Sequence, residues 1–288
     1  MENIKQALER ARAVNSGGIG HAQTILPQAQ IDPNLGIEDP LKGNERIDEV
    51  ALNLRHLESN RIIAHDDKDF RSKPFDMLRT QVLQAMDHKN WKILGITSPT
   101  PGCGKTVTAI NLAFSIARQP DRSALLVDLD LRKPHVAKSL GVSGQSGLCG
   151  VLESRTSLSK AIVRARLGDC DILVLPTETS TSDSSSWLTS RAMSAMLQEI
   201  KRDYHFGTVI LDLPPMLSSD DVIAILPQVD CLLLVVAVGK STIAEIEECN
   251  RHLYPTEVVR LVLNKVPQLN AKYYPYYASG STRLDKVR

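Results

Sequence analysis

The chain has 288 residues, 42% of them hydrophobic, and its 34 lysine and arginine residues nearly balance 33 aspartate and glutamate residues. This length suits one large α/β domain with a short appendage, or two small domains. A net charge of +1 excludes a global field that would draw the protein onto nucleic acid or an anionic membrane. No nucleic-acid partner is therefore expected.

The five cysteines are scattered, without a C-x-x-C pair or a histidine at metal-ligand spacing. This pattern argues against a disulfide framework and a zinc site, and it fits a reducing compartment. Residues 1–18 lack the apolar core of a signal peptide, and the apolar run at 231–238 is far shorter than the ~20 residues that span a bilayer. A cytoplasmic location is expected.

In chain order, residues 1–13 suit a short amphipathic helix, and 14–44 are rich in Gly, Pro, Gln and Asn without periodicity. We interpret 1–44 as a flexible N-terminal arm. Helical patterns follow at 45–59 and 74–88, the second with Pro74 at a first-turn position.

From residue 92 onward, short apolar runs alternate with amphipathic helical patterns. Runs that are apolar on both faces and separated by helices predict a doubly wound, mostly parallel α/β sheet of the P-loop NTPase type. Its ligand should lie at the carboxyl ends of the strands. The runs are KILGIT (92–97), ALLVDLD (124–130), DILVLP (171–176), TVILDLP (208–214), CLLLVVA (231–237) and VRLVLN (259–264).

The first run leads into SPTPGCGKT and a helical pattern. Backbone N–H groups of such a turn surround a β-phosphate, Lys105 supplies a positive charge, and the Thr106 hydroxyl can bind Mg²⁺. Pro99 replaces the first glycine of G-x-x-x-x-G-K-[ST], so Gly102 and Gly104 must provide the close approach. We expect the nucleotide to contact this run: Pro101, Gly102, Cys103, Gly104, Lys105, Thr106 and Val107.

The second run ends in Asp128 and Asp130, which share one side of a strand end. Beside a Mg²⁺–nucleotide, one carboxylate can serve the metal shell and the other can accept a proton from an attacking hydroxyl; helix capping is the alternative. Arg132 and Lys133 follow, either neutralising phosphate or lying in solvent.

The fourth run places Asp212 before Pro214 and Pro215. An acid there suits a Mg²⁺ anchor and the prolines a loop that senses the γ-phosphate, although a helix cap is again the alternative. Asp220 and Asp221 are expected to cap the next helix, with a place for one of them in the lining of the site as the alternative. Asn264, at the end of the last run, suits either adenine recognition or a turn.

Two further features carry open alternatives. Cys103 lies beside a helix N-terminus and Lys105, which should lower its thiol pKa; redox control or simple filling of the turn are both compatible.

Four of the six tyrosines cluster near the C-terminus, in a segment without helix or strand periodicity. They are Tyr273, Tyr274, Tyr276 and Tyr277.

These motifs together resemble the bacterial tyrosine kinases of the capsule and exopolysaccharide type, which belong to the deviant Walker P-loop ATPases. The resemblance rests on SPTPGCGKT, LLVDLDLRKP, VILDLPP with SSDD, VLNKV and the tyrosine cluster, and it runs from about residue 70 to 277. It divides the chain into an arm at 1–44, a kinase domain at 45–268 and a tyrosine-rich tail at 269–288.

The resemblance implies a protein-tyrosine kinase that uses ATP and Mg²⁺ to phosphorylate its own tyrosine cluster and so governs polysaccharide polymerisation and export. Lys105 would hold the phosphates, Thr106 and Asp212 the metal, and Asp128 and Asp130 the metal shell and the tyrosine hydroxyl. It also implies a homo-oligomer, a cognate tyrosine phosphatase, and a membrane chain-length protein as activator that holds the kinase at the inner face of the membrane.

Two departures separate the chain from that family. The helix motif E-x-x-R-x-x-R, tied to ring assembly, reads Lys73, Asp76 and Arg79 here, so a closed ring is in doubt. A Ser/Thr-rich loop, TETSTSDSSSWLTS, replaces a Pro-Asn-Pro turn. Two other functions stay open: a partitioning-type ATPase, although its cross-dimer lysine is missing from the loop, and a non-catalytic ATP-binding scaffold that regulates polysaccharide synthesis.

Overall fold

The computed structural model describes residues 47–142, 146–203, 207–253 and 256–267. The predicted arm at 1–44 and the tail at 269–288, with its four tyrosines, lie outside these residues. Eight strands in the described part form one sheet with the order β1-β4-β5-β3-β6-β2-β7-β8. The strands are β1 (Asp48–Ala51), β2 (Ile93–Thr97), β3 (Ala124–Asp128), β4 (Val163–Leu167), β5 (Cys170–Leu175), β6 (Thr208–Asp212), β7 (Cys231–Ala237) and β8 (Glu257–Asn264).

All neighbouring strands run parallel except the pair β4 and β5, which is antiparallel. The inner strands β2, β3, β6 and β7 are buried along their whole length. Their continuous apolar sequence follows from this, because helices cover both faces of a parallel sheet. The predicted mostly parallel α/β fold is confirmed.

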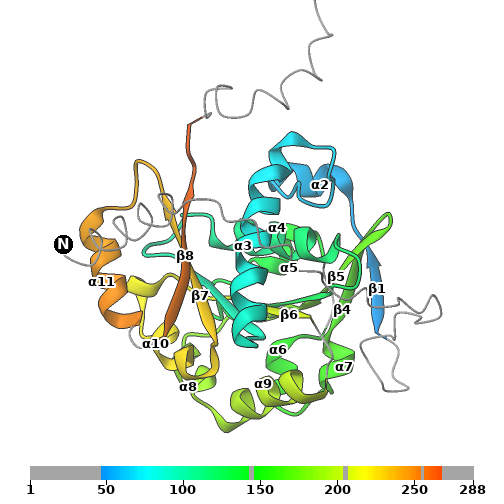
Figure 1. Ribbon diagram of the computed structural model, residues 1–288. Helices are drawn as coiled ribbons and strands as arrows, with labels where there is room; N and C mark the ends of the chain where they lie inside the picture. The colour runs from blue at the N-terminus through cyan, green and yellow to red at the C-terminus, as the bar shows by residue number, and fades with distance from the viewer. Residues whose placement is uncertain (1–46, 143–145, 204–206, 254–255, 268–288) are drawn as a thin grey trace, which may run out of the picture. The chain divides into compact units, whose positions relative to one another are not determined.

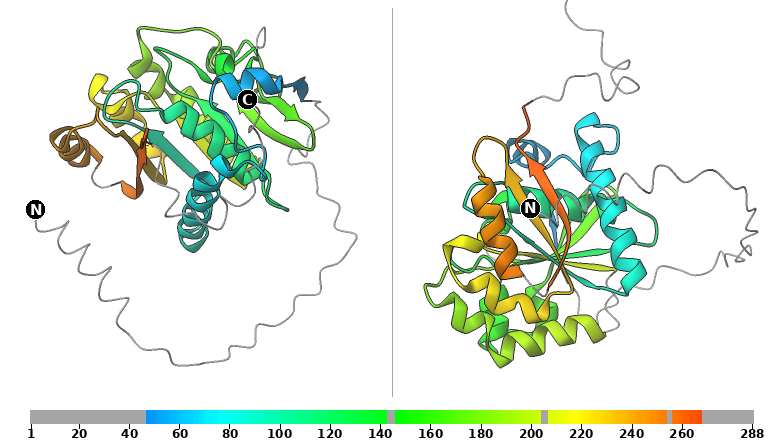
Figure 2. Two further views of the ribbon diagram at one scale, coloured as in Figure 1. Left: turned by 90° about the horizontal axis from the view of Figure 1, so that it is seen from above. Right: turned by 60° about the vertical axis from the view of Figure 1, so that its left-hand side comes forward.

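Helices cover the two faces of the sheet (Figure 1). The apolar core on one face contains residues of α2 to α5, and the core on the other contains residues of α6 to α11. The helices are α2 (Leu54–Ser59), α3 (Lys73–Lys89), α4 (Lys105–Ala117), α5 (Val136–Leu140), α6 (Leu148–Leu152), α7 (Leu158–Ala161), α8 (Ser184–Leu188), α9 (Arg191–Asp203), α10 (Asp221–Ile225) and α11 (Ile243–Leu253). Short 3₁₀ turns η1 (Phe70–Ser72), η2 (Met216–Ser218) and η3 (Leu226–Gln228) join them. Figure 2 shows the orange α11 and the cyan α3 on opposite sides of the strands.

The single helix predicted over 45–59 is wrong. Residues 48–51 form β1, which pairs with β4, and only Leu54–Ser59 is helical. β1 and β4 escape the apolar-run criterion because charged side chains alternate along them: Glu49 of β1 forms an ion pair with Arg166 of β4 at 3.1 Å. The helix predicted at 74–88 is confirmed as α3, with its proline in the first turn.

Helix α4, which follows the Gly-Lys-Thr sequence, is buried on nearly all sides rather than along one face. The Asn111 side chain ties the segment 61–64 to it, accepting hydrogen bonds from Ile63 N (2.8 Å) and Ala64 N (2.9 Å) and donating to Arg61 O (3.0 Å) and Val107 O (2.8 Å). The helix that carries the phosphate-binding sequence is therefore held between the sheet and this N-terminal segment.

Candidate nucleotide and magnesium site

The polar motifs meet at one edge of the sheet, where β2, β3 and β6 end. Asp128 and Asp212 are paired across β3 and β6, and β6 also pairs with β2, which leads into the turn at 98–104. Parallel strands bring their carboxyl ends to the same edge, which explains this meeting. The expected position of the site at the strand ends agrees with this geometry.

The turn has the backbone conformation that the glycines permit. Gly102 and Gly104 have φ values of 76° and 94°, in the left-handed region that favours glycine. Gly104 is the residue before α4, so the turn passes directly into a helix N-terminus. Neither of these glycine N–H groups donates a hydrogen bond to another described residue. Free N–H groups at a helix N-terminus form a binding site for an anion such as phosphate.

Lys105 lies between two carboxylates. Its Nζ is 2.9 Å from Asp130 Oδ2 and 3.3 Å from Asp212 Oδ1, and its side chain is only 10% exposed. Burial lowers the pKa of this ammonium, but Asp212 and Asp130 outweigh burial and the pKa is raised. The lysine therefore stays charged, and an entering phosphate group must compete with these two carboxylates for it.

Asp212 also fixes the hydroxyl of Thr106, which donates to Asp212 Oδ2 at 2.6 Å. Burial raises the pKa of Asp212, against the opposing effects of Lys105 and the Thr106 hydrogen bond. The hydroxyl proton points to Asp212, and Lys105 Nζ approaches the oxygen only at 3.4 Å, so a lone pair of Thr106 remains for a cation.

Asp128 is buried, and backbone groups occupy both of its oxygens. Oδ2 accepts from His135 N (3.0 Å) and Val136 N (2.9 Å), and Oδ1 accepts from Asp130 N (3.2 Å). These N–H donors favour the carboxylate, but burial and then Asp212 outweigh them and raise the pKa of Asp128 to about 8. Asp128 thus organises the loop after β3 and binds protons readily.

The residues fit a magnesium ion bound together with a nucleotide. No three His, Cys, Asp or Glu side chains in the described part are placed to hold a metal by themselves. Mg²⁺ typically takes one or two protein oxygens, phosphate oxygens and water, so the Thr106 hydroxyl with nearby carboxylates is sufficient.

Arg132 has a different partner from the phosphate loop. Its Nε donates to Asp221 Oδ2 at 2.9 Å, and the Ser184 hydroxyl lies 2.8 Å from both oxygens of this buried carboxylate. Asp220 occupies the predicted N-cap position of α10, but its side chain makes no capping hydrogen bond. Asp221 lies in the first turn and accepts from Ser184 of α8 instead of capping the helix. The Ser/Thr-rich loop is thus anchored beside α10 by Ser184.

Asn264 contacts the phosphate loop itself. Its Nδ2 donates to Cys103 O at 2.9 Å, and its Oδ1 accepts from Lys265 N at 2.8 Å. The adenine contact remains a prediction.

The Cys103 thiol is buried, 3.5 Å from Ser241 Oγ. Burial raises the pKa of this thiol, but hydrogen bonds with Ser241 and Thr100 and the charge of Lys240 lower it overall. The predicted direction is confirmed, although the nearby charge is that of Lys240 and not the expected Lys105.

Lys240, in the turn between β7 and α11, was missed by the sequence reasoning. Its ammonium donates to Pro101 O in the middle of the phosphate loop. The sequence VAVGKST carries only a weak signal for such a contact, namely a Gly-Lys turn directly after a buried strand. The approach of this turn to the phosphate loop depends on the pairing of β2 with β7.

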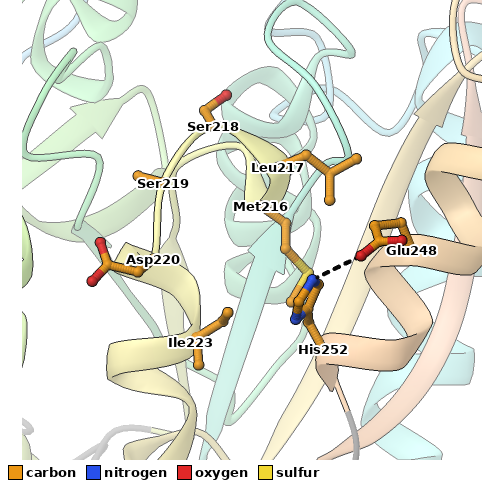
Figure 3. A pocket seen from close by; sticks show the side chains of 8 residues that line it. All are labelled: Met216, Leu217, Ser218, Ser219, Asp220, Ile223, Glu248 and His252. Atoms are coloured by element: carbon orange, nitrogen blue, oxygen red, sulfur yellow. Dashed lines mark hydrogen bonds and ion pairs between the residues drawn. The ribbon is translucent and has the colours of Figure 1, made fainter.

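A cleft of about 540 Å³ lies behind the loop that follows Asp212 (Figure 3). η2 forms one wall, and its N–H groups bind the start of the phosphate loop: Met216 N donates to Ser98 O (2.8 Å) and Leu217 N to Pro99 O (3.0 Å). Across the cleft, Glu248 and His252 of α11 form a hydrogen bond. The lining residues are Met216, Leu217, Ser218, Ser219, Asp220, Ile223, Glu248 and His252.

The altered helix motif faces the interior of the domain. Asp76 forms ion pairs with Arg79 (3.2 Å) and Arg118 and accepts from the Ser115 hydroxyl at 2.8 Å. Lys73 lies 3.7 Å from the same carboxylate. The motif residues therefore join α3 to α4 within one chain.

This loop, sheet and carboxylate set define a P-loop nucleotide-binding domain. A family model described as an AAA domain matches residues 91–252, more than half of the chain, and the chain belongs to this family. No helix among the described residues combines the length and apolar character needed to cross a membrane.

Known proteins place the chain more narrowly. It is 27% identical to the tyrosine-protein kinase YwqD of Bacillus subtilis (strain 168), over 80% of this chain and 96% of that protein. It is 32% identical to the tyrosine-protein kinase etk of Escherichia coli (strain K12), over 69% of this chain but only 27% of that protein. The solved kinase domain of Escherichia coli ETK has a TM-score of 0.60 and 28% identity, covering 69% of this chain and 78% of that one. The chain groups with the bacterial tyrosine kinases, which confirms the predicted resemblance and enzyme class.

Proposed function

We propose that this protein is an ATP-dependent tyrosine autokinase, which transfers the γ-phosphoryl group of ATP to Tyr273, Tyr274, Tyr276 and Tyr277 and thereby regulates exopolysaccharide or capsule polymerisation and export. The observation that carries the proposal is Lys105, a buried ammonium held by Asp130 and Asp212 beside a glycine turn. The N–H groups of Gly102 and Gly104 in this turn have no partner among the described residues. The names of the relatives support transfer to tyrosine.

In this proposal, the residues of the site have separate roles. The turn from Pro101 to Val107 surrounds the phosphates, and Lys105 leaves its carboxylates for the β- and γ-phosphates. Thr106, Asp212 and Asp128 would hold Mg²⁺ or its water shell, and the ion would supply positive charge beside the phosphates. Arg132 and Asn264 contribute to nucleotide binding.

Asp130 is the better placed acceptor for the tyrosine proton. Both oxygens of Asp128 accept from backbone N–H groups. In Asp130 only Oδ1 does, from Lys133 N, so Oδ2 is released when Lys105 moves to phosphate. The tyrosine oxygen then forms a bond to the γ-phosphorus as the bond to the β–γ bridging oxygen breaks. The proton passes to Asp130, and ADP leaves.

The proposal also includes partners. A membrane chain-length protein would activate the kinase and hold it at the inner face of the membrane, a cognate phosphatase would reverse the reaction, and self-association would let one copy modify another. The inward-facing Asp76 and Arg79 argue that such self-association uses contacts other than a ring built on this helix motif.

The test is phosphopeptide analysis of the full chain after incubation with ATP and Mg²⁺, with and without membranes from cells that export the polysaccharide. We expect label on the tyrosine cluster, none with Lys105→Met, and nucleotide binding without label with Asp130→Asn. ATP turnover without label would favour the partitioning-type ATPase. Binding of ATP with neither label nor turnover would favour the regulatory scaffold.

A further inference from the structure

We propose that Lys240 is a positioning residue of the nucleotide site: by binding the carbonyl of Pro101, it turns the N–H of Gly102 toward the phosphates. The inference deepens the proposed function, because it rests on the phosphate loop as the ATP site. It assigns a role to a lysine outside every recognised motif of the chain.

The contact is specific in its geometry. The Lys240 ammonium donates to Pro101 O, and a Cβ atom built on Gly102 would lie 2.8 Å from Lys240 Nζ. The lysine therefore packs against a residue of the phosphate loop that lacks a side chain. A larger residue at 102 would displace it as well as strain a φ of 76°.

The turn that carries Lys240 is held in place by its own hydrogen bonds. Lys240 N (3.1 Å) and Ser241 N (2.9 Å) both donate to Ala237 O, and Ala237 N donates to Ser241 Oγ (3.0 Å). The Ser241 hydroxyl also lies 3.5 Å from the Cys103 thiol. The turn that carries Lys240 is thus held by its own hydrogen bonds and by the contact of Ser241 with Cys103 of the loop.

The consequence follows from the planarity of the peptide bond. In a trans peptide the C=O and the N–H point in opposite directions. A carbonyl of Pro101 held on the outer side by Lys240 therefore directs the Gly102 N–H to the inner side. Asn264 acts in the same way on the peptide bond between Cys103 and Gly104. Its amide donates to Cys103 O and so directs the Gly104 N–H to the inner side.

Two donors on the outside of the loop thus orient two N–H groups that have no other partner among the described residues. Oriented N–H groups form a concave site for an anion, and fixing them before the ligand arrives lowers the cost of binding. The group recognised is the β-phosphate of the nucleotide, which ATP and ADP share. AMP lacks this phosphate, so its binding should not depend on the two N–H groups.

The test compares Lys240→Met with Lys240→Arg, which keeps a charged donor, and with Lys68→Met, an exposed lysine before η1. Titration of each full-length variant with ATP, ADP and AMP gives the dissociation constants. We expect Lys240→Met to weaken ATP and ADP equally, by about tenfold, the order for one charge-assisted hydrogen bond. AMP binding, the arginine variant and the Lys68 control should stay within about threefold of the natural chain.

A second readout separates orientation from direct contact. In ¹⁵N-labelled protein, ADP should shift the Gly102 amide resonance downfield, and Lys240→Met should reduce that shift while Lys240→Arg preserves it. An unchanged ADP affinity, a loss confined to ATP, or an unaltered Gly102 shift would each overturn the proposal. Absence of tyrosine label in the natural chain would refute the kinase function and leave this inference standing, because ADP binding is measured without turnover.

Discussion

Removal of the buried Lys105 should destabilise the protein by an amount that depends on pH. Lys105→Met keeps most of the side-chain volume but removes the cation that lies 2.9 Å from Asp130 and 3.3 Å from Asp212. Breaking a buried ion pair on one side costs about 3–5 kcal/mol, because the remaining charge is left without compensation. We expect the nucleotide-free variant to lose about 3 kcal/mol of unfolding free energy at pH 8.

The sign at low pH follows from linkage. Burial already raises the pKa of Asp212, and removal of the lysine raises it further. A carboxyl group with a raised pKa in the folded state stabilises below its unfolded pKa, and this contribution is lost as the pH rises through the folded value. The deficit of the variant should therefore be smaller at pH 5 than at pH 8, because the raised pKa of Asp212 favours its protonated form at the lower pH.

Urea denaturation of both proteins at pH 5 and pH 8 measures this difference. Lys201→Met is the matched control, since it removes a lysine 2.8 Å from Asp230 in a pair that is partly exposed. Such a pair contributes about 0–1 kcal/mol. An equal deficit for Lys105→Met at both pH values would refute the reasoning. A deficit at either pH would show that this variant changes stability as well as phosphate binding when it serves as the inactive control.

Three other changes test the contacts around the site. Asp76→Ala leaves Arg79 and Arg118 buried without their carboxylate, and urea denaturation should show a loss of about 3 kcal/mol. Asn111→Ala removes four hydrogen bonds, so hydrogen exchange should quicken at the two backbone amides that it binds, with a cost of about 2 kcal/mol. Since the pKa of Asp128 is raised to about 8, the natural chain without nucleotide should lose stability from pH 5 to pH 8, and Asp128→Asn should flatten this slope.

Each of these expectations has a contrary outcome. A loss below 1 kcal/mol for Asp76→Ala would mean that the two guanidinium groups find water. Unchanged exchange rates in Asn111→Ala would show that apolar packing alone holds the segment 61–64. A pH profile for the natural chain as flat as that of Asp128→Asn would place the Asp128 pKa near its ordinary value.

The sheet interior and the phosphate loop were predictable from local sequence. Four inner strands are buried on both faces, so their residues must be apolar throughout, and this pattern is visible without coordinates. The strands β1 and β4 were missed because exposed positions tolerate charge, and their Glu49 and Arg166 pair only once the strands are aligned. The same limit applies to Lys240, which is far from the loop in sequence.

The amino-acid sequence by itself determined the chemistry of this protein: a glycine turn with Lys105 and Thr106, and acids at strand ends, where parallel pairing must gather them. Tertiary structure decided the partners of these groups. It directs Asp76 to the interior, Arg132 to Asp221, Asn264 to the phosphate loop and Lys240 to Pro101. Side-chain partners depend on which elements pack together, and residue spacing along the chain does not contain that information.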